Sequence, residues 1–343
     1  MQSNAFIANF GGIGNGVMTM PIIALLVKRR IYNNIFCTTN PLFSDGRFFK
    51  FSGIEKKVFL VNATWRRFDI NDWNDIYNFL AQNNIRTVYN LRNEELDQYN
   101  DFKKRYGHKF RFVNINYKNL IRRKKGKRVA DDIYHLFSGV RIKNNKKIAE
   151  WLSPFKKKYN NTHQGLRVGF SVSSSNFNKE WDEGKWIALG RAILSRSKKT
   201  KVTIFHGISA DDYKKACRVQ KGIDDKARCN IILRTDLYSI ARDIGKLACL
   251  ISNDTGFVHM AAALGIPYIG IYLTTDPAVW APNTFSPHIF LKSSRVGKCP
   301  LWRGYAGTCG HFYRKCPERF RENINIGNAI SAMETLFPIF KDS

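Results

Sequence analysis

Four small polar residues, Asn253-Asp254-Thr255-Gly256, interrupt an apolar stretch of the chain, and His259 follows one helical turn later. The run before them is typical of a buried strand, and the run after them is typical of a helix that ends at Gly265 and Pro267. We therefore expect a tight strand-to-helix turn. Unpaired N–H groups at such a helix start carry the positive end of the helix dipole, which suits a diphosphate or a sugar hydroxyl.

Two interpretations of this turn stay open on its spacing alone. In one, Asp254 and His259 face a ligand. In the other, Asp254 only caps the helix and His259 is a satisfied histidine on a packed face, because such turns occur in many α/β proteins. Two further segments favour a ligand site.

The first is the glycine-rich segment 10–21 (FGGIGNGVMTMP), which follows an expected strand and leads into an expected helix. Its Gly12, Gly14 and Gly16, with Asn15 among them, let a ligand approach the backbone closely. A single glycine-rich turn is a weak signal by itself.

The second is the serine-rich segment 173–181 (SSSNFNKEW), which follows the first expected strand of the second half. Ser174 and Ser175 offer hydroxyl groups, and Lys179 can neutralise a phosphate as a point charge. The alternative for Lys179 is a solvated lysine on the surface.

Short apolar runs alternate with helical patterns along both halves of the chain. In the first half the expected strands are 5–10, 34–38, 57–61, 86–91 and 110–115, with helices at 17–29 and 72–83. In the second half the expected strands are 166–170, 201–205, 230–233, 247–252 and 268–273, with helices at 185–195, 210–219, 237–246 and 255–264. This alternation predicts an α/β fold of two doubly wound, Rossmann-like domains that face each other across a cleft. Ligands in such sheets bind beyond the carboxyl ends of the strands.

A chain of 343 residues is long enough for two domains. The polar segment 155–165 is the linker candidate, so we predict a first domain over 1–160 and a second over 161–325. We expect 326–343 to form a C-terminal helix that packs back toward the N-terminal domain.

The charge of the chain is strongly basic. Lysine and arginine number 56 against 27 acidic residues, a formal net charge of +29, which favours polyanionic partners such as nucleic acid, anionic lipid or a phosphorylated substrate. Nucleic acid is disfavoured, because no helix-turn-helix, zinc-finger or RNA-binding signature is found. The longest apolar run, 17–27, is too short to span a bilayer and lacks the basic start of a secretory signal, so we expect a cytoplasmic protein.

Seven cysteines without a CxxC pair argue against a disulfide framework and for reduced thiols. Cys299, Cys309 and Cys316 lie close together in the sequence with His311. Three thiolates and an imidazole could complete a structural zinc or iron site, but the usual two-residue spacing is absent. Buried free thiols are the alternative.

Four segments together resemble the motifs of the ADP-heptose:lipopolysaccharide heptosyltransferase family. Its members are inverting glycosyltransferases of the GT-B fold. The four segments are GGIGNGVMTMP (11–21), SSNFNKEW (174–181), GISAD (207–211) and SNDTGFVHMAAALGIPYIGIYLTTDP (252–277). The resemblance implies transfer of a heptose or similar sugar from a nucleotide diphosphate donor, ADP-heptose foremost, to a lipopolysaccharide core or another anionic saccharide. It implies no cofactor for catalysis.

The resemblance also assigns roles to residues of the second half. Lys179 and Asp254 would be catalytic, Asp211 would stand where the family has a glutamate that contacts the nucleoside, and His259 would contact sugar or phosphate. The full implied donor site is Ser174, Ser175, Lys179, Asp211, Asp254, Thr255, Gly256, His259 and Thr275. The first domain would present the acceptor near Gly12, Gly14, Asn15 and Gly16.

One position departs from the family pattern. The family's opening motif carries an aspartate regarded as the general base, and this sequence has Asn15, whose carboxamide cannot take up a proton at neutral pH. Asp45, Glu94 and Glu95 are substitutes to consider. The departure leaves a catalytically weakened sugar-nucleotide-binding protein as one alternative. The other alternative is an enzyme of the same fold with another donor sugar or a protein acceptor.

The basic run 122–128 (RRKKGKR) is solvated charge by default. If the acceptor is an anionic lipid-linked saccharide, the run would instead draw the protein to the inner face of the cytoplasmic membrane as a peripheral protein. Each nearby basic residue contributes about 1 kcal/mol to such attraction.

Overall fold

The computed structural model describes residues 3–8, 13–38, 56–60, 73–90, 96–114, 166–233, 236–298, 302–303, 308–309 and 324–338. The described residues up to Asn114 belong to one compact unit, and those from Leu166 onward belong to a second. The boundary predicted at residue 160 and the linker candidate 155–165 lie outside the described residues.

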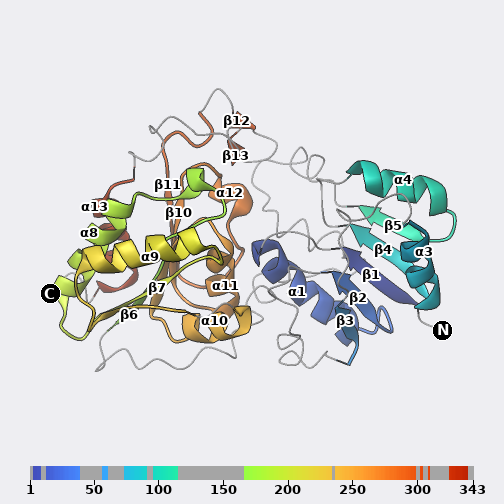
Figure 1. The fold of residues 1–343 in the computed structure, drawn as a ribbon, viewed down its shortest axis with the longest axis horizontal. Coiled ribbons are helices and arrows are strands. Elements are labelled where there is room, and N and C mark those ends of the chain that lie inside the picture. Colours follow the sequence, from blue (N-terminus) through green and yellow to red (C-terminus); the bar gives the residue numbers. More distant parts are fainter. Residues whose placement is uncertain are drawn as a thin grey trace. The chain divides into compact units, whose positions relative to one another are not determined.

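The first unit is built on a parallel sheet in the strand order β3-β2-β1-β4-β5 (Figure 1). Its strands are β1 (Asn4–Ala8), β2 (Ile35–Thr38), β3 (Val58–Leu60), β4 (Ile85–Asn90) and β5 (Arg111–Asn114). Its helices are α1 (Ile13–Lys28), α3 (Trp73–Gln82) and α4 (Leu96–Tyr106). The chain order reverses between β1 and β4, as in a doubly wound fold.

The second unit contains a parallel sheet in the order β8-β7-β6-β9-β10-β11 (Figure 1). Its strands are β6 (Arg167–Ser171), β7 (Lys201–Phe205), β8 (Cys229–Ile231), β9 (Cys249–Asn253), β10 (Tyr268–Tyr272) and β11 (His288–Lys292). Its helices are α8 (Glu183–Arg196), α9 (Ala210–Ile223), α10 (Leu237–Ile244), α11 (Gly256–Leu264), α12 (Pro277–Trp280) and α13 (Ile326–Leu336), with a 3-10 turn η5 (Phe177–Lys179). Here the order reverses between β6 and β9, which is where ligands bind in such sheets. The predicted α/β class with two doubly wound sheets is confirmed.

Helices cover both faces of this second sheet. Ile251, Ile269 and Ile271 point to the face where α8, α9 and α13 complete a core. On the other face, the ring of Phe205 contacts Phe257 of α11. Gly169 lies on that same face, and a Cβ there would force the side chain of Leu247 to shift and would crowd Leu250. The sheet is therefore closely packed on both faces.

The predicted C-terminal helix is present as α13. It packs on α8, β10 and β11 of the second unit, where Ala329, Ala332 and Met333 are buried. An ion pair of 2.6 Å joins Arg196 of α8 to Glu334. Its apolar stripe at helical spacing thus completes the core of the second sheet, and packing of 326–343 toward the N-terminal domain stays a prediction.

The described cysteines outside the 299–316 cluster are free thiols. Cys37, Cys229 and Cys249 are buried in β2, β8 and β9. Burial raises the pKa of Cys37 and of Cys229 to about 12, so these thiols stay protonated and act as packing residues.

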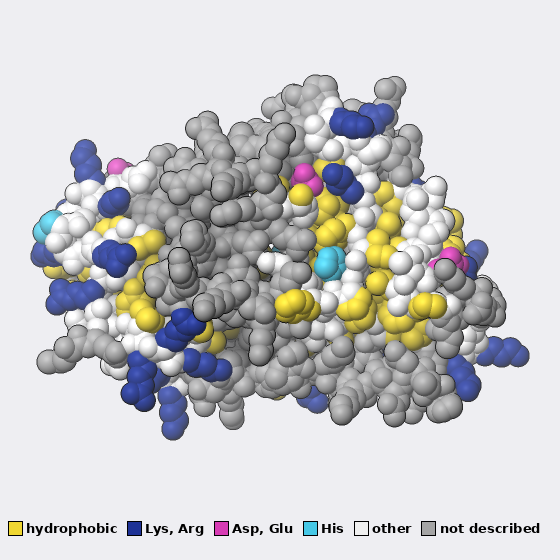
Figure 2. Space-filling model, turned by 180° about the vertical axis from the view of Figure 1, so that it is seen from behind, with side chains coloured by type: hydrophobic (Ala, Val, Ile, Leu, Met, Phe, Trp, Pro, Cys, Tyr) yellow, Lys and Arg dark blue, Asp and Glu magenta, His cyan; other side chains and the backbone are white. Residues whose placement is uncertain are grey.

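The surface is basic where the structure describes it. On the face seen in Figure 2, Lys and Arg side chains (dark blue) are spread widely, and few acidic side chains (magenta) lie among them. Within the described ranges, no helix combines the length and the apolar composition needed to cross a membrane.

Candidate active site

The loops that follow β6 and β9 lie side by side at the reversal point of the second sheet. Asn253, at the end of β9, is fully buried and joins them through its side-chain amide. The Trp181 N–H donates to Asn253 Oδ1 (2.9 Å), and Asn253 Nδ2 donates to the Val172 carbonyl (3.1 Å). The two segments predicted to grip a diphosphate are therefore brought together by one buried side chain.

Lys179 and Asp254 form an ion pair across these two loops. Lys179 Nζ lies 2.7 Å from Asp254 Oδ2, and the Thr275 hydroxyl donates to the same oxygen (2.6 Å). The side chains are 17% and 5% exposed, so the pair is mostly shielded from water. Both partners that the structure describes for this carboxylate, Lys179 and Thr275, are on Oδ2.

Asp254 is a carboxylate in the folded protein. Burial opposes the charged form, but the ion pair with Lys179 and the hydrogen bonds from Lys179 and Thr275 outweigh it and hold the pKa of Asp254 below its ordinary value. His259 lies one turn into α11 and is 7% exposed. Burial lowers the pKa of His259 to about 4, so the imidazole is neutral at pH 7 and can donate or accept a hydrogen bond but cannot neutralise a phosphate.

Thr255, and not Asp254, caps helix α11. The Thr255 hydroxyl accepts from the Phe257 N–H (3.3 Å). The interpretation in which Asp254 only caps the helix is thus wrong, because its carboxylate turns to Lys179 and Thr275. His259, in contrast, is buried as the second interpretation has it, yet its Nδ1 has no hydrogen-bond partner within the described ranges. The Gly256 N–H also has no partner among the residues that the structure describes, as expected for an anion-binding helix start.

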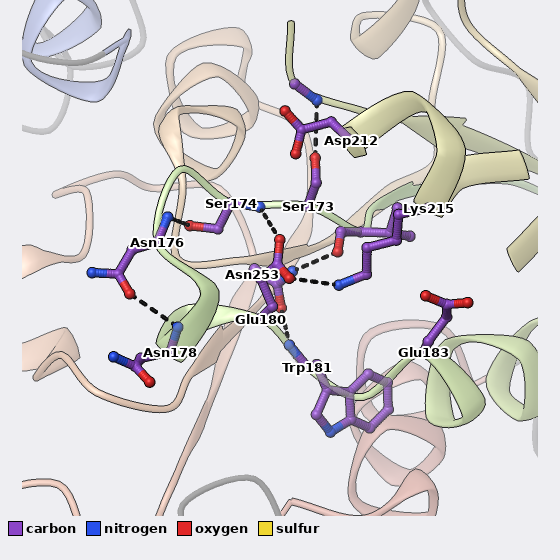
Figure 3. Close-up of polar contacts among 12 residues, drawn as sticks. Ser173, Ser174, Asn176, Asn178, Glu180, Trp181, Glu183, Asp212, Lys215 and Asn253 are labelled. Carbon is purple, nitrogen blue, oxygen red and sulfur yellow. Dashed lines mark hydrogen bonds and ion pairs between the residues drawn. The ribbon is translucent and has the colours of Figure 1, made fainter. Parts of the chain in front are cut away.

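The serine-rich loop holds itself together by short-range hydrogen bonds (Figure 3). The Ser174 N–H donates to Glu180 Oε1 (2.9 Å), and the Asn176 N–H donates to Ser174 Oγ (3.3 Å). Ser173 Oγ accepts from the Gly207 N–H at the end of β7 (2.9 Å). Ser174 is therefore engaged within the protein, whereas Ser175 is exposed and makes no hydrogen bond with the described residues.

Three residues of this constellation were absent from the sequence-based site: Glu180, Lys215 and Asn253. Lys215 of α9 donates to Glu180 Oε2 (2.9 Å). The signal for Glu180 was its place inside the SSNFNKEW segment, and the signal for Asn253 was a carboxamide at the end of a buried strand. Lys215 carried no local signal, because its partner lies 35 residues earlier.

Asp211 lies apart from the Lys179–Asp254 pair. It occupies the first turn of α9, is 92% exposed at its side chain, and lies 3.5 Å from Lys214. Asp212 next to it forms a capping box with Ser209. Asp211 stands at the carboxyl edge of the sheet, and its contact with a nucleoside stays a prediction.

The glycine-rich segment belongs to the first unit. α1 begins at Ile13, four residues before the predicted start at 17, so Gly14, Asn15 and Gly16 lie in its first turn. Gly12 and the side chain of Asn15 lie outside the described residues, as do Asp45, Glu94, Glu95 and the basic run 122–128. The general base is therefore not located by the structure.

The cysteine cluster is described only in part. Cys309 lies in strand β13 (Thr308–Cys309), which pairs with β12 (Trp302–Arg303). Cys299, His311 and Cys316 lie outside the described residues. Within the described ranges no group of His, Cys, Asp and Glu could hold a metal ion, and the zinc or iron site stays a prediction.

Several solved structures of heptosyltransferases and glycosyltransferases have a similar fold. E. coli heptosyltransferase WaaC with ADP has a TM-score of 0.66 at 14% identity, covering 97% of this chain and 99% of that chain. E. coli ADP-heptose lps heptosyltransferase II has a TM-score of 0.66 at 12% identity, covering 99% of each chain. The iron-containing dodecameric glycosyltransferase TibC from enterotoxigenic E. coli has a TM-score of 0.59 at 11% identity, covering 98% of this chain and 76% of that one.

At these identities the likeness shows the fold, which is the GT-B fold predicted from the sequence. A search of curated proteins gives no match. A sequence model of glycosyltransferase family 9 (heptosyltransferase) matches residues 100–299, which is more than half of the 343 residues. With the fold, the switch-point loops and this match in agreement, the chain belongs to glycosyltransferase family 9, the heptosyltransferase family.

Proposed function

We propose that this glycosyltransferase moves a heptose or a similar sugar from a nucleoside diphosphate donor, ADP-heptose foremost, to a lipopolysaccharide core or another anionic saccharide, with inversion. The observation that carries the proposal is the Lys179–Asp254 pair beside the start of α11 at the reversal point of the sheet. That edge is where α/β sheets bind nucleotides.

The reaction is a displacement in which negative charge builds up on the departing diphosphate. Lys179 and the Gly256 N–H would stabilise that charge from fixed positions, which is electrostatic catalysis. Asp254 Oδ1 would accept a hydrogen bond from a sugar hydroxyl, while Oδ2 keeps its bonds to Lys179 and Thr275. Ser175 adds an exposed hydroxyl on the same loop.

Similar solved structures support the identity of the donor, and the net charge supports that of the acceptor. Structures of WaaC contain ADP and ADP-2-deoxy-2-fluoro heptose, and one of TibC contains ADP-D-beta-D-heptose. These ligands support ADP-heptose as the donor here. The net charge of +29 supports an anionic acceptor, held at the inner face of the cytoplasmic membrane.

Calorimetry with ADP, GDP and UDP tests the donor. We expect ADP to bind most tightly, and we expect transfer from ADP-heptose to a lipopolysaccharide core when product formation is followed by mass spectrometry. Binding of none of the three nucleotides would overturn the proposal, and a preference for GDP or UDP would replace its donor.

A second candidate is a catalytically weakened sugar-nucleotide-binding protein, favoured by Asn15 in the first turn of α1. If a general base is missing, Asn15→Asp should raise turnover by about 10²-fold or more, because general-base help is worth 10²–10⁴-fold. An unchanged rate would show that a base is supplied elsewhere or that the chain does not use one.

A further inference from the structure

We propose that Glu180 is a positioning residue that ties the diphosphate-binding loop to helix α9, and so fixes the spacing between the diphosphate end and the nucleoside end of the donor site. The inference rests on the proposed function. It concerns a residue that touches neither end of the donor itself.

Each carboxylate oxygen of Glu180 has its own donor (Figure 3). Oε1 accepts from the Ser174 N–H of the loop (2.9 Å), and Oε2 accepts from Lys215 Nζ of α9 (2.9 Å). The side chains of Glu180 and Lys215 are 20% and 11% exposed, so this pair is shielded more than an ordinary surface ion pair. A charge-assisted pair of hydrogen bonds of this kind fixes both distance and direction.

Neighbouring side chains of the loop are tied to different elements. Lys179 reaches the turn between β9 and α11 through Asp254, and Glu180 reaches α9 through Lys215. The Ser173 hydroxyl adds a bond to the Gly207 N–H, in the segment that leads into α9. The loop is therefore held between two helix starts. One is the start of α11, at the proposed diphosphate site, and the other is the start of α9, where Asp211 lies in the first turn.

This arrangement also decides which loop groups are open to phosphate. Because the Glu180 carboxylate already accepts from the Ser174 N–H, that amide does not serve the ligand. Phosphate oxygens would meet Ser175 and Lys179 instead. The Glu180 carboxylate thus takes the place that a phosphate oxygen could otherwise occupy at the Ser174 N–H, and Lys215 neutralises its charge.

A nucleoside diphosphate is two binding fragments joined by a covalent link. Its affinity exceeds that of its separate fragments only when the two subsites lie at the spacing that the link requires. Loss of the Glu180 tie should therefore reduce the binding of the whole nucleotide more than the binding of either fragment.

The chain offers a matched control. Glu183 of α8 forms a bidentate pair with Arg218 of α9, at 2.8 and 2.9 Å, so it also links the start of α8 to α9. Its partner Arg218 is 58% exposed, and Glu183 accepts from no N–H of the serine-rich loop in the contacts that the structure describes. Glu183→Gln therefore removes a link between α8 and α9 without removing a described hydrogen bond of the serine-rich loop.

The experiment measures the affinities of wild type, Glu180→Gln, Lys215→Met and Glu183→Gln for ADP, adenosine and pyrophosphate by NMR titration. We expect Glu180→Gln to weaken ADP about tenfold while each fragment changes less than about twofold, because only the spacing between subsites is lost. Lys215→Met should give the same pattern. The double variant of Glu180→Gln with Lys215→Met should bind ADP no more weakly than either single variant does. Glu183→Gln should leave all three affinities within about twofold.

Urea unfolding of each variant checks that it is folded. Equal losses for ADP and for its fragments would overturn the inference, because they indicate a general loosening of the site. ADP affinities of Glu180→Gln and Glu183→Gln that agree would also overturn it. Wild type that binds none of the three ligands is a different result, which defeats the proposed function together with this inference.

Discussion

The two edges of the second sheet differ in how their charged side chains are paired. At the carboxyl edge, Lys179–Asp254 and Glu180–Lys215 are complementary pairs, each joining segments far apart in the sequence and each at least four-fifths buried at its side chains. Such pairs hold their geometry, because neither partner can turn away without leaving a charge unpaired in a shielded place.

At the amino edge, two basic residues face each other with no ion-pair partner among the residues that the structure describes. Arg167 and Lys201 stand directly opposite each other on β6 and β7, and neither has an ion pair with any residue that the structure describes. They line a pocket of about 270 Å³ together with Arg228 and Lys246, which form ion pairs with Asp225 and Asp243. Like charges in directly opposed strand positions are destabilising.

This difference separates the charges that fix a local geometry from those that only add to the net charge of +29. Paired charge at the carboxyl edge joins the loops and α9 in a fixed geometry, at the edge where the strand order reverses. The unpaired charges of Arg167 and Lys201 at the amino edge add to the general attraction for anions but fix no geometry.

Lys179→Ala should show the largest effect. We expect kcat/KM for transfer from ADP-heptose to fall about 10²–10³-fold, because a fixed donor to the departing diphosphate is lost. The matched variant is Lys246→Ala at the amino edge, whose Nζ lies 2.6 Å from Asp243. Steady-state kinetics should show less than about a twofold change for it. Similar losses in the two variants would erase the distinction between the edges.

Asn253→Ala should have the next largest effect, on stability. It leaves the Trp181 N–H and the Val172 carbonyl without their partner in a buried place, so the free energy of unfolding should fall by about 2–4 kcal/mol. Asn230 of β8 is exposed and accepts from Thr203, and Asn230→Ala should cost less than about 0.5 kcal/mol. Urea unfolding measures both, and a cost at Asn253 no larger than at Asn230 would refute the role of the buried amide.

Acid should weaken the carboxyl edge through His259. Its pKa in the folded protein is lowered to about 4, so between pH 6.5 and 4 the unfolded chain binds a proton that the folded chain excludes. The free energy of unfolding should therefore fall with decreasing pH, by up to ~1.4 kcal/mol per pH unit from this group. The lowered pKa of Asp254 adds a loss only at still lower pH, below its ordinary value of 3.8.

Urea unfolding at several pH values measures this slope. His259→Asn should remove its contribution between pH 6.5 and 4, and His108→Asn, at an exposed position of the first unit, should not. An unchanged slope in His259→Asn would mean that this histidine can be protonated in the folded protein.

The smallest effect should come from the amino edge itself. The double variant Arg167→Ala with Lys201→Ala removes two opposed like charges, so the free energy of unfolding should stay within ~0.5 kcal/mol of wild type or rise slightly. ADP affinity at 0.15 M salt should change less than about twofold, because exposed charges are screened. A large loss in either measurement would show that this edge, too, has a specific role.

Much of the element order follows from local pattern. The predicted strands of the second unit begin and end within two residues of those in the structure for β6 to β10, because buried parallel strands are continuous apolar runs bounded by turn formers. α4 has no such signal, since LDQYNDFKKRY is mostly polar, and Phe102 is the buried side chain among the residues 100–106 whose burial is described. β11 is an edge strand of five residues with mostly half-buried side chains. It therefore also lacks a strong apolar pattern and was not predicted from the sequence.

The sequence by itself determined the alternation of strands and helices, the turn at 253–256 and the residue types available for phosphate binding, because these depend on neighbours a few residues apart. Only the tertiary structure decided that Lys179 meets Asp254, that Glu180 meets Lys215, and that α13 packs in the second unit. The reversal of strand order between β6 and β9 places loops about 75 residues apart in the chain at one edge of the sheet, and no local pattern contains that step.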